Sequence, residues 1–137
     1  MNVLATIRKF RTEQFRVIVD AIEDYDMDLS WDEDGSVLRK LESGEYVAFC
    51  ARARVIHDEL GEIASDYLGG CIYADIAEFQ DHRECAAQTR KLRAEEGRDD
   101  IVCGSYFSDM VSAVCEEARA EVTRLRSKVA GLYVRAA

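Results

Sequence analysis

Apolar and polar residues alternate in two segments of the N-terminal half, which is the pattern of strands with one buried face. The first segment spans residues 15–22 and is rich in β-branched side chains. The second spans residues 45–57, with apolar side chains on one side and a basic outer face that includes Arg52 and Arg54 on the other. Both segments are predicted to be half-buried antiparallel strands.

A third strand is expected over residues 65–75, where Gly69 and Gly70 indicate a bulge. Residues 58–62 have the composition of the turn that leads into it. Residues 3–12 are compatible with a short amphipathic helix or with a terminal arm, because apolar residues there lie three or four positions apart. The strands therefore predict a small three-stranded antiparallel meander.

The remaining elements have a helical period. A short helix capped by Asp34 or Ser36 and ended by Gly44 is expected first, and a second helix over residues 75–96. A longer helix begins at Ser105 as its N-cap. One face of this last helix carries an apolar stripe that needs a covering layer: Phe107, Met110, Val111, Val114, Ala118, Val122, Leu125 and Val129.

These elements predict an α+β fold in which the three-stranded sheet packs against the long C-terminal helix and the second helix. No linker, repeat or proline marks a boundary, so residues 1–137 are expected to form a single domain. The start has no secretion signal, and no segment approaches the ~18 apolar residues of a spanning helix. A cytoplasmic protein is expected.

The cysteines indicate a reducing compartment. There are five, an odd number, and none forms a CxxC pair. Most have apolar neighbours, where a free thiol behaves as a small hydrophobe. Neither a metal site nor a cofactor is predicted.

Charge is the most unusual property of the chain. The net charge is −9, which opposes direct binding to nucleic acid. Eight acidic residues and no Lys or Arg lie between Val17 and Leu38. Such a cluster is either a solvated loop or a surface for a basic, nucleic-acid-binding partner. The residues predicted to bind this partner are Asp20, Glu23, Asp24, Asp26, Asp28, Trp31, Asp32, Glu33 and Asp34.

Aromatic residues accompany the acidic ones: Tyr25, Trp31, Tyr46, Tyr67 and Tyr73 fall in the acidic segment and near strand ends. They either cap the sheet core or anchor a protein partner while the charges steer it. Trp31 is the best anchor candidate.

Candidate chemistry is sparse. The segment from Ser30 imitates a calcium-binding loop, but it lacks Asp at the first position and has Leu41 at the twelfth. His82 and Cys85 are three residues apart on an expected helix and are the candidates for a cysteine- or metal-dependent enzyme. No nucleotide-binding, hydrolase or metalloprotease motif is present in the sequence. A protein without catalytic activity is the favoured interpretation.

Three segments, 26–31 (DMDLSW), 66–73 (DYLGGCIY) and 103–111 (CGSYFSDMV), carry a resemblance. The chain, from about Phe15 to about Arg124, resembles small accessory proteins of proteobacterial phages, plasmids and integrative elements. The resemblance implies a bacterial host cell and a genetic setting in which such proteins often inhibit host defence, as anti-CRISPR and anti-restriction proteins do, commonly by stoichiometric binding. It assigns no functional residue.

Two functions follow as hypotheses. The first is a non-enzymatic inhibitor that presents the acidic surface to a basic, nucleic-acid-binding surface of a host defence complex. The second is a homodimeric accessory or regulatory protein whose long C-terminal helix pairs with its own copy, the acidic loop serving solubility. No membrane partner is predicted in either case.

Overall fold

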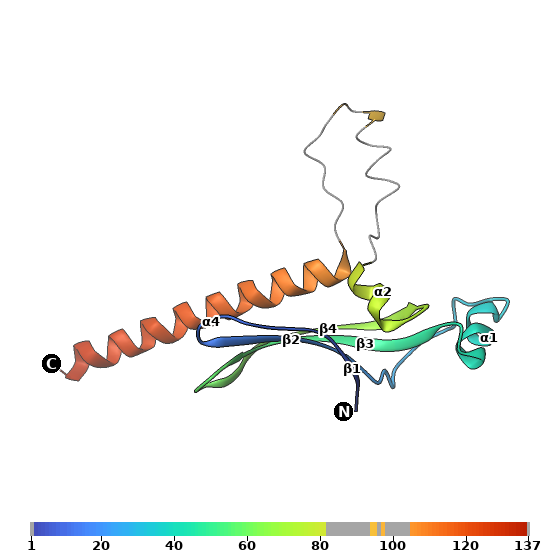
Figure 1. Cartoon of the computed structure of the whole chain (residues 1–137). Coiled ribbons are helices and arrows are strands. Elements are labelled where there is room, and N and C mark those ends of the chain that lie inside the picture. The colour runs from blue at the N-terminus through green and yellow to red at the C-terminus, as the bar shows by residue number, and fades with distance from the viewer. Residues whose placement is uncertain (1, 82–93, 96, 98–104, 137) are drawn as a thin grey trace.

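The computed structural model describes residues 2–81, 94–95, 97 and 105–136. One layer is an antiparallel four-stranded sheet in the order β1-β2-β3-β4, and helix α4 lies across one face of it (Figure 1). In chain order the elements are β1 (Val3–Arg11), β2 (Phe15–Ile22), α1 (Ser36–Ser43), β3 (Val47–His57), β4 (Gly61–Tyr73), α2 (Ile76–Asp81) and α4 (Tyr106–Ala136). The α+β class is confirmed, with four strands in place of three.

The additional strand is β1, for which the sequence predicted a helix or an arm. It pairs with β2 through a register that shifts between Thr6 and Arg8. Such a bulge inserts an extra residue, so Ile7 and Phe10 can both pack against the core although they are three residues apart. The three-residue spacing of Ile7 and Phe10, which suggested a helix, is therefore explained by a bulge in a strand.

The other three strands are confirmed, but β4 begins at Gly61, within the segment predicted to be a turn, and ends at Tyr73. Strand β2 has the expected bounds, and in β3 the apolar positions from Val47 to Val55 alternate with Arg52 and Arg54. The ladder between β3 and β4 shifts register near the glycine pair, where Gly70 has a φ of 69°. A positive φ is readily adopted by glycine, which explains why the bulge falls there.

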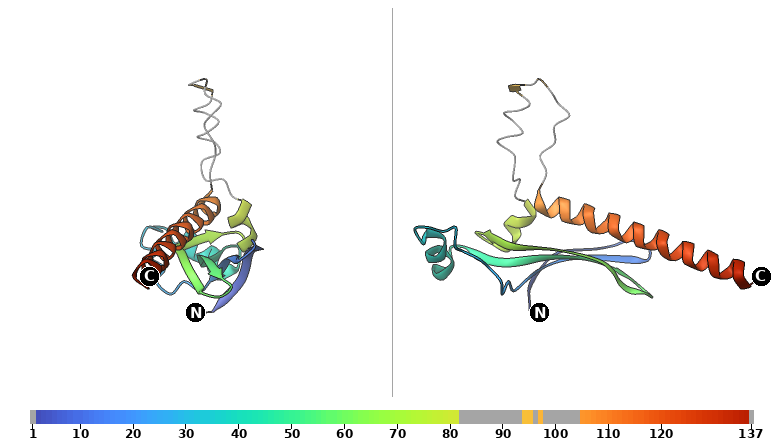
Figure 2. Two further views of the ribbon diagram at one scale, coloured as in Figure 1. Left: turned by 90° about the vertical axis from the view of Figure 1, so that its left-hand side faces the viewer. Right: turned by 180° about the vertical axis from the view of Figure 1, so that it is seen from behind.

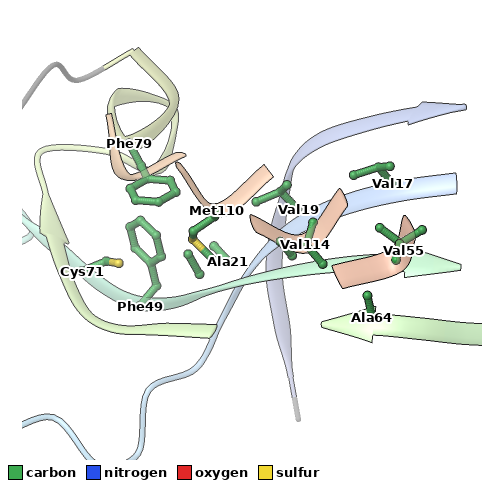
Figure 3. Packing of buried hydrophobic residues seen from close by; sticks show 13 residues of the cluster. Val17, Val19, Ala21, Phe49, Val55, Ala64, Cys71, Phe79, Met110 and Val114 are labelled. Atoms are coloured by element: carbon green, nitrogen blue, oxygen red, sulfur yellow. The ribbon is translucent and has the colours of Figure 1, made fainter. Parts of the chain in front are cut away.

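The core lies between the sheet and the helices (Figure 3). Met110 and Val114 of α4 lie over the inner face of the sheet, and Phe79 of α2 packs edge-on against Phe49 with ring centroids 5.8 Å apart. Small residues of β2 and β3 on this face, such as Ala51, allow the helix to approach closely.

Helix α4 begins as predicted, because the Ser108 backbone N–H donates to the Ser105 hydroxyl over 3.1 Å. The helix then runs past the end of the sheet at which the β1–β2 and β3–β4 turns lie (Figures 1 and 2). None of the helices in the described part of the chain is long and apolar enough to cross a membrane.

The second predicted helix is seen only in part. Helix α2 covers Ile76–Asp81, and most of the remaining expected length, including His82 and Cys85, lies outside the described residues. Helix α1 has the expected end at Gly44, whose φ is 85°.

Candidate acidic binding surface

Most of the acidic cluster predicted between Val17 and Leu38 lies at one end of the molecule. Seven of its acidic side chains lie in residues 23–34, here called the acidic loop, which connects β2 to α1. The loop and α1 sit at the opposite end of the sheet from the C-terminus of α4 (Figure 1). The acidic loop lies at this end because it follows directly after Ile22, where β2 ends.

Asp24 attaches the loop to the sheet. One of its carboxylate oxygens accepts a hydrogen bond from the Gly70 backbone N–H at 2.7 Å, and the other accepts from the Asp26 N–H at 3.2 Å. An ionised acceptor makes the shorter bond one of the stronger kind. The bulge in β4 therefore positions the start of the loop.

Asp28 folds the middle of the loop. Its side chain accepts from the Ser30 backbone N–H at 2.9 Å, and its carbonyl accepts from the indole N–H of Trp31 at 2.9 Å. The hydrogen bond from the Ser30 backbone lowers the pKa of the Asp28 carboxyl below its usual value. Trp31 remains 60% exposed although its polar atom is satisfied.

Asp32 and Asp34 hold the loop to α1. Asp32 accepts from the backbone N–H groups of Val37 at 3.3 Å and Leu38 at 3.0 Å, while Asp34 accepts from that of Ser36 at 2.9 Å. The Ser36 bond lowers the pKa of Asp34. The residue at the N-cap itself is Gly35, which gives no side-chain bond, so Asp32 caps the first turn in place of the predicted Asp34 or Ser36.

Three acidic side chains have no such role toward the backbone. Glu23 accepts hydrogen bonds from the Asn2 amide and the exposed Tyr25 hydroxyl. Asp26 and Glu33 are exposed, and neither side chain has a hydrogen bond or ion pair with another residue of the described part. A partner can therefore contact these two carboxylates without breaking a hydrogen bond of the loop.

Asp20 differs from the other predicted site residues. It lies within β2, is 3% exposed, and accepts from the guanidinium groups of Arg52 at 3.0 Å and Arg54 at 3.1 Å. The Thr6 hydroxyl donates to its second oxygen at 3.2 Å. The geometry separates Asp20 from the acidic loop. It also shows that the basic strand face neutralises a buried carboxylate, leaving Arg52 only 13% and Arg54 23% exposed at their side chains.

Aromatic residues border a hollow beside the loop. This aromatic hollow measures about 500 Å³ and is lined by Trp31, Tyr46, Tyr73 and Tyr106, together with the β4 segment from Leu68 to Ala74 and Glu78. Three of the five aromatics singled out in the sequence therefore meet. Tyr106 was missed, because its position in the first turn of α4 gives no hint that this turn lies near the acidic loop.

Tyr25 and Tyr67 are exposed outside the aromatic hollow. Tyr67 is paired with Arg52 across the β3–β4 ladder, so it belongs to the outer face of the sheet. Neither residue contributes to the lining described above.

One of the rings that line the hollow, that of Tyr46, is in contact with a cation of the same chain. The Lys40 ammonium lies 4.9 Å from the centroid of the Tyr46 ring and 3.3 Å from its hydroxyl oxygen. A cation over an aromatic face is attracted by the negative face of the ring. The same chemistry is available to a Lys or Arg from a partner.

Within residues 2–81 and the described part of α4, no group of three or more His, Cys, Asp or Glu side chains could hold a metal ion. In the segment that imitates a calcium-binding loop, oxygens of Asp32 and Asp34 accept backbone N–H groups. The calcium-like spacing is thus explained by helix capping and turn formation.

Comparisons with known proteins identify no relative: no family model, curated protein or solved structure matches the chain.

Proposed function

We propose that the protein acts by stoichiometric binding, with the acidic loop and the aromatic hollow together contacting a basic surface of a host defence complex. The surface is one on which nucleic acid would otherwise lie. The observation that carries the proposal is that the loop's carboxylates are held in fixed positions next to the exposed Trp31.

Fixed charge favours binding because little ordering remains to be done. Asp24, Asp28, Asp32 and Asp34 each accept at least one backbone N–H, so the loop is braced at both ends and at its middle. A preorganised surface loses less conformational entropy on association than a flexible one. Carboxylates have further lone pairs, which can receive the guanidinium and ammonium groups of a nucleic-acid-binding surface.

Net charge supports the same partner class. A protein of charge −9 is attracted to basic surfaces over distances of about a Debye length, which is ~8 Å at physiological salt. Trp31 and the hollow then supply the short-range apolar contact that charge alone does not. The proposal involves no catalytic step.

The choice of a defence complex rests on the expectation, drawn from the sequence resemblance alone, that the protein belongs to the setting of phages, plasmids and integrative elements. Host defence systems of the CRISPR and restriction types work on nucleic acid, so their effectors carry basic surfaces of the kind that an acidic ligand occludes.

The test is affinity capture with a variant that alters charge without removing a structural bond. Asp26→Lys/Glu33→Lys changes the two carboxylates that bond to no described residue, and Glu116→Lys/Glu117→Lys makes the same change in net charge on exposed residues of α4. The tagged proteins are used to capture CRISPR effector and restriction complexes from bacterial lysate.

We expect the wild type and the α4 variant to capture one complex, and the loop variant to bind it about tenfold more weakly or worse. Equal loss in both variants would point to net charge alone. Equal capture by all three proteins would contradict the role of the acidic loop.

A further inference from the structure

The C-terminal part of α4 exposes an apolar stripe. The helix face that packs on the sheet through Val114 and Ala118 continues past the end of the sheet (Figure 2). There it carries Leu125, Val129 and Leu132, of which Val129 is 48% and Leu132 63% exposed. An apolar stripe of this length on a helix is typical of a surface that another element covers.

A groove adjoins this stripe. It measures about 420 Å³ and lies between α4 and the ends of the strands beneath it. Its apolar lining is made by Phe10, Phe15, Val17, Val55, Cys115, Ala118 and Val122, with Arg119 and Arg126 among its polar residues. A sheet of four strands spaced ~4.8 Å apart is wider than the ~10 Å that one helix covers, so the groove has room for part of a second helix.

We propose that the occupant is α4 of a second copy of this chain, running antiparallel to the first. The exposed stripe follows a heptad repeat in which Val122 and Val129 occupy the a positions and Leu125 and Leu132 the d positions. This repeat is self-complementary in one antiparallel register. Val122 then lies against the second copy's Leu132, and Leu125 against the second copy's Val129.

This register also places an apolar side chain in the groove. Val122 lines it, so the second copy's Leu132 enters the groove beside Phe10 and Phe15. The contact is isologous, since each copy gives its helix end to the other's groove, and an isologous contact closes as a dimer.

The antiparallel direction follows from the position of the sheet. The sheet lies on the same side of α4 as the apolar stripe, and only beneath the N-terminal part of the helix (Figures 1 and 2). In an antiparallel pair, each sheet occupies the space beyond the end of the other copy's helix. A parallel pair would place both sheets between the two helices and force their N-terminal parts apart.

The charged residues beside the stripe do not select the register. Glu121 is already paired with Arg124 of its own chain. The register brings Arg126 and Lys128 of each copy near the two-fold axis, and both residues have long side chains. Their flexible stems can lie along the helix with the charged groups in solvent.

The inference does not depend on the proposed function. The acidic loop is at the far end of the sheet, so the dimer leaves both loops accessible (Figure 1). Loss of the dimer and loss of partner binding are separate results, obtained from separate variants.

The first test measures the mass of the protein in solution by light scattering after size-exclusion chromatography, over a dilution series. The wild type is expected at twice the 15.5 kDa of one chain. Val129→Glu/Leu132→Glu should give a single chain, because it buries charge in the proposed seam, while Ser127→Glu/Ala130→Glu on the opposite side of the helix should remain dimeric. Circular dichroism checks that each variant is folded.

A single-chain mass for the wild type at the highest concentration would overturn the proposal, and this is also the result if another partner covers the stripe. A dimer that persists in folded Val129→Glu/Leu132→Glu would overturn it as well.

The second test is direction. An equal mixture of Leu125→Cys and Val129→Cys chains should form an interchain disulfide on oxidation that neither variant forms alone, with the wild type measuring the background from native cysteines. Efficient crosslinking of Val129→Cys alone would indicate a parallel pair and contradict the register.

Discussion

Replacing Asp20 by Asn tests whether this carboxylate is a structural ion or part of a binding surface. Its oxygens accept from Arg52 at 3.0 Å, Arg54 at 3.1 Å and Thr6 at 3.2 Å, and its side chain is 4% exposed. In addition, the buried Nε atoms of Arg52 and Arg54 have no hydrogen-bond partner in the described part of the chain. Both guanidinium groups therefore depend on Asp20 for a hydrogen-bond acceptor and for a compensating negative charge.

The expected cost can be bracketed from this geometry. Breaking a fully buried ion pair by removing one partner costs about 3–5 kcal/mol. Arg54 is partly exposed and also lies 4.0 Å from Glu62, so solvent and a second carboxylate reduce the penalty on its side. We expect Asp20→Asn to lower the free energy of unfolding by about 3 kcal/mol, a large share of the ~5–15 kcal/mol that stabilises a typical domain.

The assay is urea-induced unfolding followed by circular dichroism, with Asp26→Asn as the matched control. Asp26 is exposed, so its substitution should change stability by no more than about 0.5 kcal/mol. A cost below about 1 kcal/mol for Asp20→Asn would refute the reasoning, because it would mean that the two arginines find solvent or other acceptors without loss.

Three further outcomes are expected. Phe79→Ala should lower the free energy of unfolding by about 3–5 kcal/mol, because this ring is buried between the sheet and α4; a loss under 1 kcal/mol in urea unfolding would contradict its place in the core. Because the native state lowers the pKa of Asp28 and Asp34, their stabilising contribution is present above the unfolded pKa of about 3.9 and is lost as the pH falls through the lower native value. The stability gap between wild type and Asp28→Asn/Asp34→Asn should therefore narrow below about pH 4, and a gap independent of pH would argue against these hydrogen bonds. Burial raises the pKa of the Cys50 thiol, so iodoacetamide should modify it more slowly than a free cysteine at pH 8, as read by peptide mass spectrometry; an equal rate would show that the thiol is not shielded.

The sequence correctly predicted the elements that have a regular apolar period and clear capping or turn residues at their ends. The bounds of strand β2 and the start of α4 were predicted correctly, because alternating β-branched residues and a serine N-cap are signals contained in the local sequence. The prediction of a helix or an arm for residues 3–12 was wrong, because the bulges of β1 break the period of two and its apolar spacing imitates that of a helix. Pairing with β2 decides its conformation, and pairing is a tertiary interaction that no local window contains.

In the candidate site, too, the sequence predicted the local pattern but not the interactions that depend on the fold. The acidic loop was visible in the sequence as an uncompensated run of charge, but the particular role of each carboxylate was not. Asp20 and Asp24 are four residues apart, yet one is buried against two arginines and the other bonds to the backbone of Gly70. These roles depend on β3 and β4, which are distant in sequence, so only the fold distinguishes them.

The central claim is that the acidic loop occupies the place of nucleic acid on its partner. The most direct measurement titrates the protein into the captured defence complex carrying a fluorescently labelled nucleic acid, and follows displacement by anisotropy. We predict displacement at close to one protein per binding site, with Asp26→Lys/Glu33→Lys requiring about tenfold more protein or worse. Simultaneous binding of the protein and the nucleic acid would contradict the claim.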